Sequence, residues 1–298
     1  MIKRTLFFGN PYHLSTSNRQ LEIKNKETGK ISHASIEDIG YIVFEHPQIT
    51  FSQNVIQLLA ANNTAVIFCN EKYHPCSMLL HLDTNYVQTE RFKAQVNATE
   101  PLKKQLWQQT IKAKLNNQAA ALEYQGGSGS ALRYKSGKVL SGDATNEEAK
   151  GARIYWKALL GSSFKRDRYG EGPNSALNYG YAILRAATAR ALSGSGLLAT
   201  LGIHHRNKYN SFCLADDIME PYRPYVDVLV CDMQNQGFNC GELSIAEKSE
   251  LLSILTIDIK TNEGNSPLMI ALSKTSASLV RCFEKKAKKI FYPKLKLQ

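Results

Sequence analysis

The spacing of the apolar residues changes near residue 84, and this change most constrains how the chain can fold. From residue 5 to about residue 82, alternating residues and short apolar runs are typical of β-strands, whose side chains point to opposite faces with a period of two. Beyond residue 86 the apolar residues recur at the helical spacing of three and four. We therefore predict an α+β chain with a small β-rich, sandwich-like domain at 1–83, a linker at 84–86 and a larger all-α domain at 87–298.

The clearest strand signal in the first domain is a hairpin. Residues 20–24 alternate between polar and apolar side chains, residues 25–30 have the composition of a turn, and residues 31–35 begin a second strand. Apolar runs at 39–44 and 65–69 are predicted as further strands. The segment between them, 52–61, is predicted as a helix, because its residues 55, 58 and 59 are apolar and fall on one helical face.

The second domain is predicted to be helical. Pro101 suits the first residue of a helix that runs to about residue 124, where a segment rich in Gly and Ser ends it. The apolar side of this helix is made by Leu102, Leu106, Ile111 and Leu115. Further helices are predicted at 145–160, 174–192, 212–230, 244–254 and 267–289.

The C-terminal residues are strongly basic. Lysines outnumber acids six to one in this tail, where Glu284 is accompanied by Lys285, Lys286, Lys288, Lys289, Lys294 and Lys296. We predict a solvated, partly frayed terminus, with a DNA contact as the alternative.

The whole chain is basic as well, with 37 Lys and Arg against 26 Asp and Glu and a formal net charge of +11. Such a charge favours polyanions, so nucleic acid is the leading partner, with a merely basic, well-solvated surface as the alternative. The sequence has neither the apolar run of a secretion signal nor the roughly 18 consecutive apolar residues of a membrane span. We expect a cytoplasmic protein with reduced cysteines and no membrane partner.

Three segments of the helical domain carry polar groups beside apolar ones. In the first, Thr145 and Glu148 have the spacing of a capping box, in which both side chains bond the backbone at the start of a helix. The alternative places Glu148 on the apolar face of that helix, one turn before Ala152, where a buried carboxylate needs a partner such as a cation.

The other two segments supply a histidine and a cluster of acids. Asp216 and Asp217 precede Glu220 by four and three residues, so on a helix the acids crowd one side and repel one another. A divalent cation would relieve that repulsion, whereas a solvated acidic edge paired with Arg223 would need none. His205 is equally open, as a hydrogen-bonded structural residue or as a ligand. Two carboxylates and an imidazole together suit Mg²⁺ or Mn²⁺ and phosphodiester chemistry.

The spacing of four segments carries a family resemblance. They are Glu148-x-x-x-Ala152-Arg153-x-Tyr155-Trp156, Asn174-x-x-Leu177-x-Tyr179-Gly180-Tyr181-x-x-Leu184, Gly202-x-x-His205 and Asp217-x-x-Glu220-Pro221-Tyr222-Arg223-Pro224-x-x-Asp227. In order and spacing this resembles the signature of the CRISPR-associated spacer-acquisition integrase and endonuclease, in the branch found in type II systems. The resemblance also covers the architecture, because that family joins an N-terminal β-rich domain to a C-terminal helical one.

By position, the resemblance implies that Glu148, His205 and Glu220 are the catalytic residues and the ligands of Mg²⁺ or Mn²⁺, with Asp217 as a further acid near the site. Glu148 is preferred to Glu147 because Glu148 shares a helix face with the apolar residues at 152 and 155. The family's first motif usually has Gly directly after its glutamate, where this chain has Ala149.

The implied activity is the joining of the 3′-OH ends of short foreign DNA fragments into a CRISPR array by transesterification, in antiviral defence in a prokaryotic cytoplasm. The implied partners are double-stranded DNA, a second copy of the chain bound through the N-terminal domain, and a small ferredoxin-like adaptation subunit. A type II effector nuclease and a ring-shaped DNA-end binder are further candidates. A nuclease or branched-DNA resolvase that cuts without joining, and a non-catalytic DNA-binding scaffold, remain alternatives.

DNA-backbone contacts near the site are expected from basic residues of the helical domain. The candidates are Arg153, Lys165, Arg166, Arg168, Arg206, Lys208 and Arg223. Arg153 and Arg223 could instead be paired with the local acids.

Overall fold

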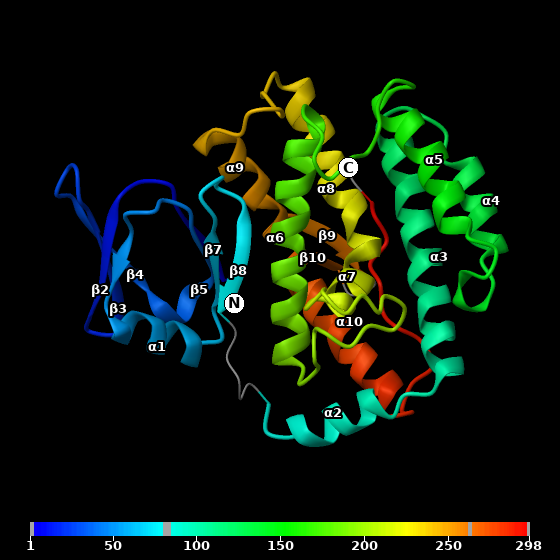
Figure 1. Ribbon diagram of the computed structural model, residues 1–298, viewed down its shortest axis with the longest axis horizontal. Coiled ribbons are helices and arrows are strands. Elements are labelled where there is room, and N and C mark those ends of the chain that lie inside the picture. The colour runs from blue at the N-terminus through cyan, green and yellow to red at the C-terminus, as the bar shows by residue number, and fades with distance from the viewer. Residues whose placement is uncertain (1–2, 80–84, 262–263, 297–298) are drawn as a thin grey trace. The chain divides into compact units, whose positions relative to one another are not determined.

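The computed structural model describes residues 3–79, 85–261 and 264–296. It divides into two compact units, Met1–Thr84 and Asn85–Gln298 (Figure 1). The division falls within the predicted linker, 84–86, of which residue 84 lies outside the described residues. The predicted order of a β-rich unit followed by a larger helical one is confirmed.

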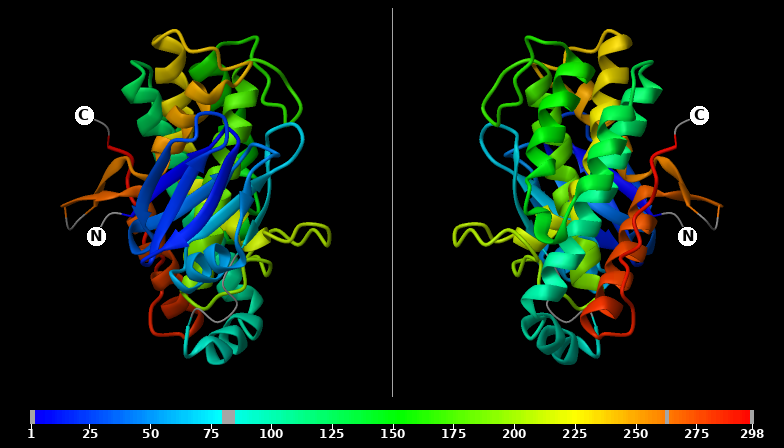
Figure 2. Two further views of the ribbon diagram at one scale, coloured as in Figure 1. Left: turned by 90° about the vertical axis from the view of Figure 1, so that its left-hand side faces the viewer. Right: turned by 90° about the vertical axis from the view of Figure 1, so that its right-hand side faces the viewer.

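The first unit contains two four-stranded sheets, seen face-on in the left view of Figure 2. One has the order β1-β5-β7-β8, with strands Arg4–Phe8, Ile39–Phe44, Ala65–Cys69 and Pro75–Leu79. The other has the order β4-β3-β2-β6, with strands Ile31–Ser35, Gln20–Asn25, Tyr12–Ser17 and Thr50–Phe51. A 3₁₀ turn, Ile36–Asp38, and helix α1, Gln53–Ala61, complete the unit.

A single hydrophobic core joins the two sheets of this unit, as expected of a sandwich-like domain. Leu14 and Leu21 from the second sheet pack with Ile42 and Val66 from the first and with Val55 of α1. The predicted hairpin at 20–35 is confirmed, since β3 and β4 pair antiparallel.

The second unit is built from helices. They are α2 (Gln88–Val96), α3 (Glu100–Tyr124), α4 (Ser130–Lys138), α5 (Glu147–Leu160), α6 (Pro173–Gly194), α7 (Cys213–Met219), α8 (Arg223–Asn235), α9 (Ile245–Leu252) and α10 (Leu268–Phe283). The 3₁₀ turns η2 (Ser141–Asp143), η3 (Glu220–Tyr222) and η4 (Ser253–Leu255) lie between them. The prediction of an all-α domain is wrong in one respect, because strands β9 (Asp258–Thr261) and β10 (Gly264–Pro267) form a hairpin before α10. The pattern also failed to predict α2 and α4.

Helix α3 is the centre of this unit. It packs against α4 and α5 on one side and against α7, η3 and α8 on the other (Figure 1). Its length and its start beside Pro101 agree with the prediction. Because it is covered on two sides, it buries polar residues as well as apolar ones, and these include Thr110, Lys114 and Asn117.

The predicted helix at 212–230 is wrong, since α7 ends at Met219 and α8 begins at Arg223. The 3₁₀ turn between them contains Pro221, and Pro224 follows in the first turn of α8. A proline ring has no N–H to continue the helical ladder and clashes with the preceding turn. Glu220 therefore lies at a bend rather than along a straight helix.

The predictions for the C-terminus are also wrong. Helix α10 ends at Phe283 rather than at 289, and the chain turns at Lys285, which has a φ of 59°. The following residues run along α3, where Gln109 donates to the Lys288 carbonyl and Asn117 donates to the Pro293 carbonyl. Up to residue 296 the tail is therefore held by α3 and is not frayed. No helix in the described part of the chain has the length and apolar character to cross a membrane.

Candidate functional site

Glu148 lies in the first turn of α5 and takes no part in capping that helix. The predicted capping box of Thr145 and Glu148 is wrong, because the N-cap is Asn146, whose side chain accepts from a backbone N–H of the first turn. The carboxylate of Asp143 accepts from the N–H groups of Glu147 and Glu148, at 2.9 and 3.0 Å. Since other side chains satisfy the helix end, the Glu148 carboxylate is available for another role.

The two adjacent glutamates contact different cations. Glu147 forms ion pairs with Lys135 at 3.3 Å and with Lys150 at 2.7 Å. Glu148 Oε1 instead lies 2.6 Å from Nζ of Lys114, which comes from α3. Glu148, and not Glu147, therefore belongs to the cluster around Lys114.

Lys114 connects Glu148 to Glu220. Its ammonium is 2.6 Å from Oε1 of Glu148 and 2.6 Å from Oε2 of Glu220. The other oxygen of Glu220 pairs with Arg223 at 3.0 Å. The exposed fraction of the side chain is 10% for Lys114, 25% for Glu148 and 5% for Glu220. Helices α3 and α5 and the turn η3 thus bring two carboxylates onto one cation.

The electrostatics of this cluster favour ionised groups. Burial by itself would raise the pKa of Glu220, but Arg223 and Lys114 outweigh it and the pKa is lowered. Burial would lower the pKa of Lys114, but Glu220 and Glu148 outweigh it and the pKa is raised. Oε2 of Glu220 is buried, and the Lys114 ammonium is its ion-pair partner.

His205 is oriented by Asp217, which is fully buried in α7. The Asp217 carboxylate accepts from the backbone N–H groups of Ile203 (2.7 Å), His204 (2.9 Å) and His205 (3.3 Å). It also lies 2.5 Å from Nδ1 of the His205 ring. This hydrogen bond is the main reason that the pKa of His205 is raised. In the neutral ring, donation from Nδ1 to Asp217 leaves Nε2 with a lone pair.

The turn that carries His205 requires glycine at its start. A Cβ on Gly202 would lie 2.4 Å from the carbonyl oxygen of His205 and 2.8 Å from Oδ2 of Asp217. His204 points elsewhere and stacks on Trp107, with ring centroids 4.2 Å apart. Burial, followed by the neighbouring His205, lowers the pKa of His204. Of the two adjacent histidines, only His205 contacts Asp217 through its side chain.

The three residues predicted as metal ligands affect one another electrostatically. As they stand, they do not form a metal site. Glu220 and Glu148 both contribute to the raised pKa of His205. Within residues 3–79, 85–261 and 264–296, however, no three His, Cys, Asp or Glu side chains are grouped in a way that could hold a metal ion as they stand. The position between the two carboxylates is taken by the Lys114 ammonium.

A family model described as CRISPR associated protein Cas1 matches residues 6–241 of this chain. The chain belongs to the Cas1 family. A CRISPR-associated endonuclease Cas1 of Neisseria meningitidis serogroup C (strain 8013) is 35% identical over 298 residues, covering 99% of this chain and 97% of that protein.

Two solved structures share the fold of this Cas1-family chain. A casposase bound to integration product aligns with a TM-score of 0.81 at 18% identity, covering 97% of this chain and 92% of the casposase chain. A Cas6-RT-Cas1–Cas2 complex aligns with a TM-score of 0.74 at 19% identity, covering 99% of this chain and 36% of the longer chain.

Other residues of the helical unit, most of them from the four segments that carry the resemblance, form a network around a buried acid. Asp227 of α8 accepts from the hydroxyl of Tyr155 at 2.8 Å and from that of Tyr181. Burial raises the pKa of Asp227 to about 6, although the two hydroxyl groups oppose the shift. The guanidinium groups of Arg166 and Arg223 lie 5.2 and 4.8 Å from the ring centre of Tyr181. The network ties α5, α6 and α8 together.

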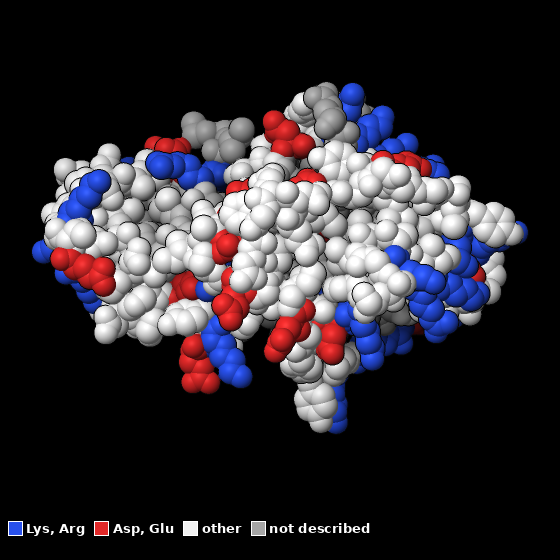
Figure 3. All heavy atoms as spheres, turned by 90° about the horizontal axis from the view of Figure 1, so that it is seen from above, with Lys and Arg blue, Asp and Glu red and all other residues white. Residues whose placement is uncertain are grey.

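The predicted DNA contacts fall into two groups. Arg166 and Arg223 are engaged within the protein, Arg166 with the side chains of α6 and Arg223 with Glu220. Arg206 is exposed but also pairs with Glu100. The exposed candidates are Arg153, Lys165, Arg168, Arg206 and Lys208. Of these, Arg206 and Lys208 line a hollow of about 460 Å³ together with His205. Figure 3 shows further Lys and Arg side chains towards the end of the helical unit that carries α4 and α5.

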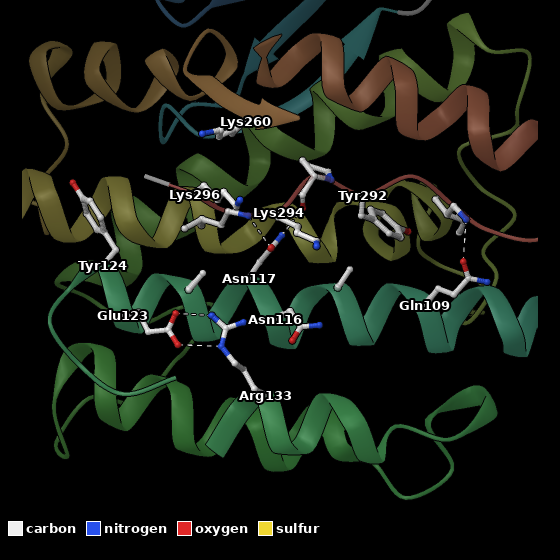
Figure 4. Close-up of a pocket in the computed structure, with 15 residues that line it drawn as sticks. Gln109, Asn116, Asn117, Glu123, Tyr124, Arg133, Lys260, Tyr292, Lys294 and Lys296 are labelled. Carbon is white, nitrogen blue, oxygen red and sulfur yellow. Dashed lines mark hydrogen bonds and ion pairs between the residues drawn. The ribbon is translucent and has the colours of Figure 1, made fainter. Parts of the chain in front are cut away.

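A larger groove of about 980 Å³ follows α3 and the C-terminal tail (Figure 4). Lys260, Lys294 and Lys296 line it on one side, and the paired Glu123 and Arg133 line it on the other. The lysines of the tail thus keep their charges exposed while the backbone is held.

Sequence reasoning missed Lys114, although a signal for it was present. Lys114 lies three residues after Ile111 and one before Leu115, on the apolar side of α3. A lysine on such a face needs a counter-charge if it is buried. The sequence pattern also failed to predict that Asp143 caps α5, because the spacing of a capping box favoured Thr145.

Proposed function

We propose that this Cas1-family chain is a divalent-metal-dependent DNA integrase and endonuclease of CRISPR adaptation. It joins the 3′-OH ends of short foreign DNA fragments into a CRISPR array by transesterification and so serves antiviral defence. The observation that supports this best is that Glu148 and Glu220, from separate elements, both contact the ammonium of Lys114 in a mostly buried cluster.

The donor set of this cluster fits Mg²⁺ or Mn²⁺. Glu148 and Glu220 would offer carboxylate oxygens, including the buried Oε2 of Glu220, and His205 would offer Nε2. When bound, the ion would offset charge on the scissile phosphate and favour ionisation of the attacking hydroxyl.

The protein's own groups prepare this site. Asp217 fixes the ring of His205 and selects the tautomer that leaves Nε2 open. Arg223 and Lys114 keep Glu220 ionised against the effect of burial. Because Asp217 also accepts three backbone N–H groups, the turn and the ring are held by the same carboxylate.

DNA binding is assigned to exposed basic residues of the helical unit. Arg206 and Lys208 lie at the hollow beside His205, and Arg153, Lys165 and Arg168 are exposed elsewhere in the same unit. Contacts from such residues to phosphates give affinity without reading the base sequence, which suits an enzyme that must accept many fragments. Binding should weaken steeply as salt is added.

Joining, rather than cutting alone, is supported by the likeness to a casposase bound to integration product. The likeness to a chain of a Cas6-RT-Cas1–Cas2 complex supports assembly with a small second adaptation subunit. We further propose a homodimer formed through the N-terminal unit, and the type II effector nuclease and the DNA-end-binding ring as additional partners.

The test is a joining assay with a short duplex carrying free 3′-OH ends, a plasmid containing a CRISPR array, and Mg²⁺ or Mn²⁺. Glu148→Gln and Glu220→Gln should each lower joining by about 100-fold or more while DNA binding survives. Glu147→Gln is the matched control, since its ion pairs lie with Lys135 and Lys150. It should join nearly as well as the unaltered protein.

Three outcomes would contradict the proposal. Full joining by Glu148→Gln would show that Glu148 is not part of the site. Joining that persists in EDTA would show that the reaction needs no divalent metal. Cleavage of the plasmid with no covalently joined fragment would favour the nuclease that cuts without joining. A duplex with 3′-dideoxy ends should not be joined, because it lacks the attacking hydroxyl.

A further inference from the structure

Lys114 is the residue of the cluster that the family motifs do not contain. It lies in the middle of α3, outside the four segments that carry the resemblance. Its ammonium contacts the carboxylates of Glu148 and Glu220 at equal distances of 2.6 Å, and its side chain is 10% exposed. A buried ammonium on two acids occupies the position that a shared metal ion would take.

We propose that Lys114 is a built-in counter-cation of the metal site, which holds Glu148 and Glu220 together in the metal-free protein and withdraws when a divalent ion enters. This inference rests on the proposed function. Lys114 is then a positioning residue. A metal ion must break its ion pairs in order to bind, and this lowers the affinity for the metal.

Electrostatics explain why such a cation is needed. Two carboxylates that converge in a mostly buried place repel each other, and each loses hydration. An ammonium between them offsets both effects. Without it, Glu148 would lose this ion pair and Glu220 would keep only its pair with Arg223, so the metal-free protein would either distort or take up protons.

Two features make Lys114 displaceable. Lysine carries a compact charge on a flexible chain, whereas an arginine would form a fixed two-pronged contact. In addition, Glu220 keeps Arg223 as a second partner on its other oxygen. Glu220 therefore remains compensated when the ammonium withdraws.

The experiment compares Mn²⁺ affinity, measured by calorimetric titration of the full chain without DNA, among variants at position 114. Lys114→Met removes the competing charge with little change in length, so it should bind Mn²⁺ about tenfold more tightly or better. Its melting temperature without metal should fall, and Mn²⁺ should raise that temperature more than in the unaltered protein.

A second variant keeps the test decisive if Lys114→Met does not fold without metal. Lys114→Arg retains the positive charge, and its guanidinium is harder to displace, so it should bind Mn²⁺ several-fold more weakly than the unaltered protein. The control is Lys135→Met, which removes an ammonium 3.3 Å from the neighbouring Glu147. Its Mn²⁺ affinity should be unchanged.

We predict that Mn²⁺ affinity decreases from Met to Lys to Arg at position 114. Equal affinities, or weaker binding by Lys114→Met, would overturn the inference. Glu148→Gln and Glu220→Gln are titrated beside them. If these two bind Mn²⁺ as well as the unaltered protein, or if that protein binds none, the proposed function fails as well. If they bind weakly but the order at position 114 is absent, only the role of Lys114 is wrong.

Discussion

Asp227 is a buried acid whose charge opposes the folded state near neutral pH. Its pKa is raised from 3.8 to about 6 by burial, and the hydroxyl groups of Tyr155 and Tyr181 offset only part of this effect. Between these two values the folded protein binds more protons at Asp227 than the unfolded chain does. The contribution of protonated Asp227 to the free energy of unfolding is therefore complete below pH 3.8 and is lost as the pH rises through 6.

Replacement of Asp227 by Asn should remove this dependence. The amide stays neutral and can still bond both tyrosine hydroxyls. Relative to Asp227→Asn, the unaltered protein should lose up to about 3 kcal/mol of unfolding free energy between pH 4 and pH 7. Urea unfolding of both proteins at several pH values measures the difference. Parallel curves would show that the charge of Asp227 does not affect folding in this range.

At the scale of elements, the extended tail and the bend at η3 are joined to α3 through one side chain. Asn117 donates to the carbonyls of Pro221 and Pro293, at 2.7 and 3.1 Å, and accepts from the N–H of Leu295 at 3.0 Å. The same residue thus fixes the tail and the turn that starts at Glu220.

Asn117→Ala should leave those three backbone groups without a partner. Buried unpaired groups cost about 1–3 kcal/mol each, so the three together should lower the melting temperature by about 6 °C or more. Trypsin should also cleave the tail faster. Asn116→Ala, at the exposed neighbouring position, is the control. Equal melting temperatures and cleavage rates for the two variants would mean that Asn117 does not hold the tail.

The sequence pattern was reliable where neighbouring residues decide the structure. The hairpin at 20–35 and the start of α3 beside Pro101 follow from local chemistry, and both were predicted. The order of the tail depends on residues far away in the chain, such as Gln109 and Asn117, and composition alone suggested fraying. The break at η3 was missed because helical spacing outweighed the two prolines in the prediction.

The candidate site shows the same division. Glu148, His205, Glu220 and Asp217 were chosen from spacing within the motifs, which indicates the residues but not their contacts. Lys114 is about 34 residues from Glu148 in the chain and meets it only because α3 packs on α5. Pairings of this kind depend on tertiary structure, and a lysine within a helix is ordinarily expected at the surface.

At the scale of the whole molecule, the net charge of +11 and the acids around Lys114 would suit one substrate, DNA, under the proposed function. The exposed lysines and arginines would bind a DNA backbone. Glu148 and Glu220 would bind the Mg²⁺ or Mn²⁺ ion that acts on it. The family assignment rests on residues 6–241, which include all of the predicted ligands.

The central claim is that Glu148, His205 and Glu220 bind one divalent ion. Anomalous diffraction from crystals of the full chain grown with Mn²⁺ tests it most directly. We predict a single strong manganese peak contacted by both carboxylates and by Nε2 of His205, with the Lys114 ammonium moved away from at least one carboxylate. A manganese peak elsewhere, with Lys114 still bridging Glu148 and Glu220, would contradict the account.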